Sequence, residues 1–284
     1  MRHLSTLAVA IVVGACACGL TTRQQAAVQT FSAATMDFTT LASSEFVKTR
    51  TDLLQMNALR LQLNDRALDP TRMDAPFTVD RVKVRIDALT ALQRYALLLR
   101  TLVTTSQEAE LQRASDSFIT SVRSVQGVTL SDERAAAISA AVQRVGGLLV
   151  EYLRARAVRE VVMGADGAVL QLASLVRRDF DPEGDDWSLG YDLVVTALEG
   201  AAEVAARRDG TRDAAAITEA RILARRNRDR VVVIAGEVTG AADGIARAEI
   251  NLREAVQSRD VNTADIERFA NQVQDFVTIY TILR

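Results

Sequence analysis

The residue types that most often carry catalysis or bind metals occur only near the start of this 284-residue chain. Its single histidine is His3, and its two cysteines are Cys16 and Cys18. Beyond them the sequence has no imidazole and no thiol, which excludes Ser-His-Asp and Cys-His catalysis there. The same absence excludes the usual His/Cys sites for zinc, copper and haem, so we expect no cofactor. These exclusions favour a protein that is not an enzyme.

The segment that holds these residues has the pattern of a removable targeting signal. Arg2 precedes an apolar run from about Leu4 to Ala15. About 12 apolar residues are too few to cross a bilayer core of roughly 30 Å, so this run is not expected to span a membrane. Small residues then lead into the first cysteine, which ends the signal pattern.

The sequence Val13-Gly14-Ala15-Cys16 resembles the lipobox of bacterial lipoproteins. The resemblance implies that residues 1–15 are removed and that Cys16 becomes a diacylated N-terminus, with Cys18 as the alternative lipidation site. It also implies anchoring by acyl chains such as palmitate in the bacterial cell envelope, facing the periplasm. The residue after the acylated cysteine is Ala17 or Gly19 rather than the aspartate that favours inner-membrane retention, so the outer membrane is favoured.

The composition predicts an all-α fold. Hydrophobic residues make up 49% of the chain and aromatic residues only 5%, and alanine, leucine and arginine are abundant. We expect residues 16–284 to form a single domain, an elongated antiparallel bundle of long helices, with its Ser/Thr-rich N-terminal part as a possible tether. The net charge of −2 gives no reason to expect a nucleic acid as partner.

Hydrophobic periodicity and turn residues place the helices. A loop with two prolines is expected at 64–78, and a break is expected at the Asp209-Gly210-Thr211 turn. The apolar phase continues across Gly164 and Gly167, so one helix is expected to run through them. The expected helices span 22–64, 79–126, 132–179, a segment through 191–205, 213–258 and 263–283.

The helix expected at 213–258 has the most regular pattern in the chain. Six heptads predict left-handed, coiled-coil-like packing, and the many alanines in the seam predict close helix axes. Gly236, Gly240 and Gly244 form a row in which each glycine costs about 1 kcal/mol relative to alanine. We interpret this row as the close approach of another helix of the same chain, with a homo-oligomer seam as the alternative. The apolar run 231–234 predicts that this helix is enclosed.

Two polar segments are candidate binding sites. The first resembles the start of a calcium-binding loop, although Pro182 interrupts it and its twelfth position is Gly190, so a solvated linker is the alternative. Its candidate metal ligands are Asp179, Asp181, Glu183 and Asp185. The second is a basic region that could bind phosphate groups or an acidic partner, or form a solvated face paired with neighbouring acids. Its arginines are Arg221, Arg225, Arg226, Arg228 and Arg230.

Three functions follow from these observations. The leading hypothesis is a non-enzymatic, lipid-anchored envelope protein that acts as scaffold, adaptor or inhibitor by binding another envelope protein through its helical surfaces. The first alternative is a periplasmic carrier of a small apolar or lipid ligand. The second is a carboxylate-dependent hydrolase of envelope glycan, because glycosidases need only Asp and Glu, although no pair of carboxylates can be singled out.

Overall fold

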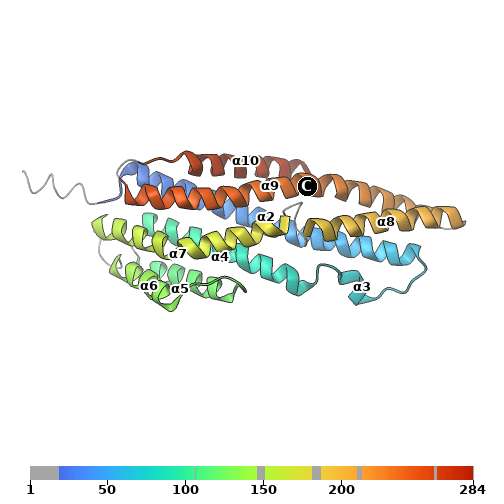
Figure 1. Ribbon diagram of the computed structural model, residues 1–284, viewed down its shortest axis with the longest axis horizontal. Helices are drawn as coiled ribbons and strands as arrows, with labels where there is room; N and C mark the ends of the chain where they lie inside the picture. Colours follow the sequence, from blue (N-terminus) through green and yellow to red (C-terminus); the bar gives the residue numbers. More distant parts are fainter. Residues whose placement is uncertain are drawn as a thin grey trace, which may run out of the picture. The chain divides into compact units, whose positions relative to one another are not determined.

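The computed structural model describes residues 19–105, 107–145, 151–180, 187–209, 213–258 and 261–283 (Figure 1). The described residues form helices and no strand, which confirms the predicted all-α bundle. The helices are α2 (Thr22–Leu63), α3 (Pro70–Asp74), α4 (Val79–Thr104), α5 (Glu108–Ser124), α6 (Asp132–Val145), α7 (Glu151–Phe180), α8 (Trp187–Asp209), α9 (Ala214–Gln257) and α10 (Ala264–Leu283). Among the described residues, no helix is long and apolar enough to cross a membrane.

The chain packs into two compact units, and the long helices contribute a segment to each. Of the described residues, the first unit comprises those within 19–36, 91–171 and 244–271, and the second comprises those within 37–90, 172–243 and 272–283. The segment considered above as a tether is the start of α2, where Val28 and Phe31 are fully buried.

Aromatic rings lie in the core of each unit. In the first unit the ring of Phe31 lies 6.1 Å from Tyr95 and 6.2 Å from Phe269, between ring centroids. In the second unit the rings of Phe38 and Phe276 are 6.4 Å apart. Because these residues come from distant parts of the sequence, their packing joins α2, α4 and α10 by apolar burial.

The structure corrects two of the expected helices. The helix expected at 79–126 is divided into α4 and α5. At this point the Thr104 hydroxyl donates to the Arg100 carbonyl, and the Thr105 hydroxyl accepts from the Gln107 amide at 3.2 Å. Hydroxyl groups that bond nearby backbone atoms offer the chain an alternative to helical bonding, which is a physical reason for the division.

The helix expected at 132–179 was also predicted as one element, and that prediction is wrong. Arg144 of α6 forms two hydrogen bonds with Glu160 of α7, at 2.9 and 2.7 Å, so the two helices lie side by side. A single straight helix would separate residues sixteen positions apart by about 24 Å. The prediction of a continuous helix through Gly164 and Gly167 is confirmed by α7.

Glycine allows close packing in α7, but not at the predicted row in α9. A Cβ atom at Gly164 would lie 2.9 Å from Cγ1 of Ile138 on α6, which is too close for any larger residue without movement. By contrast, a Cβ at Gly236 or Gly240 would meet nothing within 4 Å. The interpretation of these two glycines as the site of a close intramolecular approach is therefore wrong.

The heptad pattern of α9 predicted the buried face correctly and the opposite face incorrectly. Most seam positions are buried, including Ala224, Ile234 and Val238. However, the side chain of Val232 is 72% exposed and that of Val233 is 41% exposed, so the prediction of an enclosed helix at 231–234 is wrong. The face of α9 opposite the seam is open to solvent and carries aliphatic side chains.

Candidate functional site

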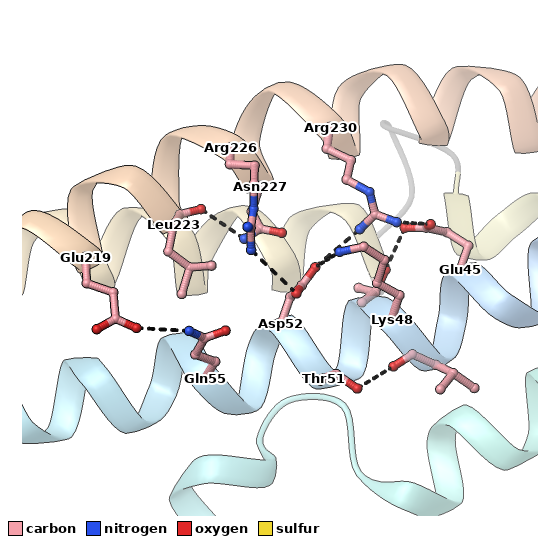
Figure 2. Close-up of polar contacts among 12 residues, drawn as sticks. Glu45, Lys48, Thr51, Asp52, Gln55, Glu219, Leu223, Arg226, Asn227 and Arg230 are labelled. Atoms are coloured by element: carbon pink, nitrogen blue, oxygen red, sulfur yellow. Dashed lines mark hydrogen bonds and ion pairs between the residues drawn. The ribbon is translucent and has the colours of Figure 1, made fainter. Parts of the chain in front are cut away.

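The second unit encloses a cluster of charged side chains between α2 and α9 (Figure 2). Arg230 donates to Glu45 and, through Nη1, to Oδ2 of Asp52 at 3.3 Å. The three side chains are 5%, 1% and 9% exposed, respectively. Buried charges are tolerated only when they are paired, because removing each ion from water costs several kcal/mol. Arg230 therefore compensates two carboxylates at once.

Three further side chains support the same carboxylates. Lys48 Nζ lies 2.8 Å from Asp52 Oδ2, and the Thr49 hydroxyl donates to Glu45 at 3.0 Å. Arg226 approaches Asp52 from α9 at 3.9 Å (Figure 2). Burial raises the pKa of Glu45, and the charge of Arg230 opposes this effect by favouring the ionised form. Every carboxylate of the cluster is thus committed to an internal ion pair.

A buried hydrogen bond next to the cluster joins α8 to α9. The Tyr191 hydroxyl donates to Oδ1 of Asn227 at 2.5 Å, and Nδ2 of Asn227 donates to the Leu223 carbonyl at 2.9 Å. Burial also raises the pKa of Tyr191, which keeps the hydroxyl protonated as a donor. A fully buried amide in a helical seam fixes which residues face each other, so the contact sets the register of α8 on α9.

The first unit contains a buried acid of its own, Glu249 of α9. Its Oε1 accepts a 2.7 Å hydrogen bond from the hydroxyl of Tyr95 on α4, and its Oε2 has no hydrogen-bond partner among the described residues. The whole residue is 0% exposed. Burial raises the pKa of Glu249 to about 8, and the charge of Asp166 adds to this effect, whereas the Tyr95 bond and the charge of Arg253 lower it. Glu249 is therefore neutral at pH 7.

The surface of the second unit carries an open groove between α8 and α9. The groove has a volume of about 370 Å³, and its lining includes Leu189, Val195, Val232 and Ala235. Leu189 is 49% exposed. Leu193, which lies in the sequence between the groove-lining residues Asp192 and Val195, is 61% exposed. We call this surface the α8/α9 face. Exposed aliphatic side chains gathered around one groove are typical of protein–protein contact sites.

The five arginines of the predicted basic region are divided between the interior and this surface. Arg226 and Arg230 point toward the buried carboxylates (Figure 2). Arg228 pairs with Glu199 of α8 at 2.8 Å. Arg221 and Arg225 are exposed and form no ion pair with another described residue. Only part of the region is thus arranged as the basic patch that the sequence suggested.

A second groove on the α8/α9 face contains Arg221 and Arg225. It has a volume of about 810 Å³, and Arg228 borders both this groove and the apolar one. Two of its acids are already neutralised, because Glu199 pairs with Arg228 and Glu203 pairs with Arg207. The groove therefore retains cationic groups that are available to a carboxylate from outside the chain.

The other predicted site residues fall largely outside the described part of the chain. Both candidate lipidation residues, Cys16 and Cys18, lie outside it, as do Asp181, Glu183 and Asp185 of the calcium-like loop. Asp179 lies in the last turn of α7. Among the described residues, no group of three or more His, Cys, Asp or Glu side chains is placed to hold a metal ion.

Sequence reasoning missed the buried acids, although two of them leave a recognisable signal. Glu45 and Asp52 are seven residues apart, and they continue a heptad row that contains the buried residues Phe38 and Leu59. Acids at two successive positions of an apolar seam indicate a buried ion pair. The sequence does not indicate the partner, because Arg230 lies 185 residues from Glu45.

Comparisons with known proteins identify no relative of the chain. No protein-family model matches it, and no curated protein or solved structure is significantly similar to it. The helical-bundle class of the fold is therefore established by the structure alone.

Proposed function

We propose that this protein is a lipid-anchored, non-enzymatic component of the bacterial cell envelope that binds another protein through the α8/α9 face. The observation that carries this proposal is the exposure of aliphatic side chains around the apolar groove. Val232 at 72% and Leu193 at 61% lie on neighbouring helices of one unit. Exposed aliphatic side chains that gather around one groove are typical of surfaces that serve binding.

The charge of the same face specifies the chemistry of the partner. Arg221 and Arg225 are four residues apart, so they lie on one side of α9. Neither forms an ion pair with another described residue, and the same holds for two exposed acids of this face, Asp229 in the second groove and Asp192 in the apolar groove. Arg221 and Arg225 thus present two cationic groups beside the apolar groove, with Asp229 and Asp192 as the unpaired acids near them. A complementary partner segment presents aliphatic side chains next to carboxylates.

The open shape of the groove favours a protein over a small apolar ligand. A ligand carrier covers most of the surface of its ligand, whereas the groove wall at Val232 faces solvent. The buried carboxylates of the second unit give no support to glycan hydrolysis, because Glu45 and Asp52 are held by internal ion pairs.

The anchor is tested by replacing both Cys16 and Cys18 with serine. We expect the double variant to leave the membrane fraction and accumulate as a soluble protein. The acyl chains would be absent, and no helix among the described residues could span the membrane in their place. Fractionation of cells that produce each variant measures this result. The single serine variants identify the acylated residue, and a double variant that stays in the membrane fraction would refute the anchor.

A further inference from the structure

We propose that the end of the first unit at which α2 begins lies directly against the membrane, with the lipid headgroups as its partner. This inference rests on the proposed acyl anchor and adds the surface that meets the bilayer. We call this surface the anchor end. It consists of residues 19–24, the start of α7 at Glu151, residues 255–258 at the end of α9, and residues 261–264 at the start of α10.

The first turn of α2 is fixed by a reciprocal cap. The Thr21 amide donates to Oε1 of Gln24 at 2.9 Å, and the Gln24 amide donates to the Thr21 hydroxyl at 3.1 Å. This capping box satisfies two amides that would otherwise lack partners. The helix therefore begins at a defined place instead of fraying toward the N-terminus.

Contacts on two sides tie this turn to the rest of the first unit. Nε2 of Gln24 donates to the carbonyls of Ala255 and Ser258, each at 2.9 Å, and Gln24 is only 2% exposed. A Cβ atom at Gly19 would lie 3.1 Å from Cβ of Glu151, so the chain already touches the start of α7 at this residue. The chain is thus held to the packed unit from Gly19 onward.

The short reach from the lipidation site to Gly19 places the anchor end at the bilayer. Three residue steps separate Cys16 from Gly19, and a fully extended chain covers at most about 11 Å in three steps. If Cys18 carries the lipid, the single step is about 4 Å. In both cases the segment between the acylated cysteine and Gly19 is much shorter than the long dimension of the first unit. The unit therefore cannot move far from the headgroups.

The chemistry of the anchor end suits a phosphate-bearing surface. Arg23 is exposed and forms no ion pair with another described residue. It borders a groove of about 350 Å³ between α2 and α10, together with Val261, Thr263 and Glu267, and the carboxylate of Glu267 accepts a hydrogen bond from the Thr263 hydroxyl. A guanidinium group can donate two hydrogen bonds to one phosphate, so Arg23 is the cation that we expect to contact lipid headgroups.

The opposite end of the same unit provides an internal reference position. The Thr129 amide donates to Oε1 of Gln171 at 2.8 Å, which fixes the turn between α5 and α6 beside that residue of α7. Helix α7 rises by about 30 Å between Glu151 and Gln171. Thr129 therefore lies well away from the anchor end within one compact unit.

The inference is tested with an environment-sensitive fluorophore at each end. Ala264→Cys labels the anchor end and Thr129→Cys labels the reference end, and both positions are exposed. The cysteine that is not acylated is replaced by serine in both variants. Each labelled, acylated protein is reconstituted in vesicles of phosphatidylethanolamine and phosphatidylglycerol that contain a lipid with a spin-labelled headgroup, which quenches nearby fluorophores.

We expect the label at Ala264 to lose most of its fluorescence and the label at Thr129 to keep it. The mass of the N-terminal peptide shows whether the protein is acylated. If it is, equal quenching at the two positions, or stronger quenching at Thr129, would overturn the proposed orientation but not the anchor. An N-terminal peptide without the acyl mass would overturn the proposed anchor and the orientation with it. The mass measurement thus separates the two failures.

Discussion

Replacing Arg230 with methionine is expected to lower the free energy of unfolding by about 3–5 kcal/mol, because Glu45 and Asp52 would remain buried without their shared cation. Methionine keeps much of the apolar stem, so the loss reports the charge and its hydrogen bonds more than the packing. Urea unfolding followed by circular dichroism at neutral pH measures the change. The loss is expected to become smaller at acidic pH, where the two carboxyl groups can be protonated.

Arg228→Met is the matched control for this prediction. Arg228 lies two residues away on the same helix, but its pair with Glu199 is largely exposed, with side chains 44% and 37% accessible. Exposed pairs contribute about 0–1 kcal/mol, so this variant should unfold almost as the parent protein does. Similar losses in the two variants would show that Arg230 does not compensate buried charge. The triple variant Glu45→Gln, Asp52→Asn, Arg230→Met should recover part of the stability, because it leaves no buried ion unpaired.

The second large effect concerns the pH dependence of Glu249. Burial raises its pKa to about 8, so the folded state holds a proton that the unfolded state has released above about pH 4.5. Because the folded state binds this additional proton in the window, the contribution of Glu249 to the free energy of unfolding falls as the pH rises from about 4.5 to about 8, and then levels off. The side chain introduced by Glu249→Gln cannot ionise, so the free energy of unfolding of this variant should not show the decline. Its stability relative to the parent should therefore grow by roughly 4 kcal/mol across the window.

Urea unfolding at a series of pH values measures this difference, and Glu160→Gln provides the contrast. The hydrogen bond from Arg144 lowers the pKa of Glu160, so its contribution is present above the unfolded pKa and is lost only in acid. The difference between Glu160→Gln and the parent should consequently be constant from about pH 5.5 to pH 9. A Glu249→Gln variant whose stability followed the parent at every pH would show that Glu249 is already ionised in the folded protein.

The sequence predicted what depends on local periodicity, and the seam of α9 is the clearest example. Residues such as Ala224 and Val238 are buried because a seven-residue repeat presents one stripe of a helix to its neighbours. The helix expected at 22–64 also agrees with α2, which ends at Leu63. In each case the signal and the structural feature lie within one helix.

The sequence could not predict features that depend on which helices become neighbours. The apolar run 231–234 has no partner on one side, and nothing in the run itself indicates that Val232 stays exposed. The side-by-side arrangement of α6 and α7 is set by contacts such as Arg144–Glu160. The Arg230 cluster likewise combines residues from distant segments. The heptad spacing of the two acids in α2 can be recognised in the sequence, whereas their partner Arg230 cannot.

The most direct test of the proposed function is site-specific photo-cross-linking of the full-length protein in living cells. A photoreactive amino acid at Val232 probes the apolar groove, and the same group at Val47, which is 53% exposed on α2 and does not line that groove, is the control. We predict one discrete adduct with an envelope protein at Val232, absent at Val47 and lost when Leu193 and Arg225 are both replaced with glutamate. No adduct at Val232, or the same adducts at both positions, would contradict the assignment of the α8/α9 face as the binding surface.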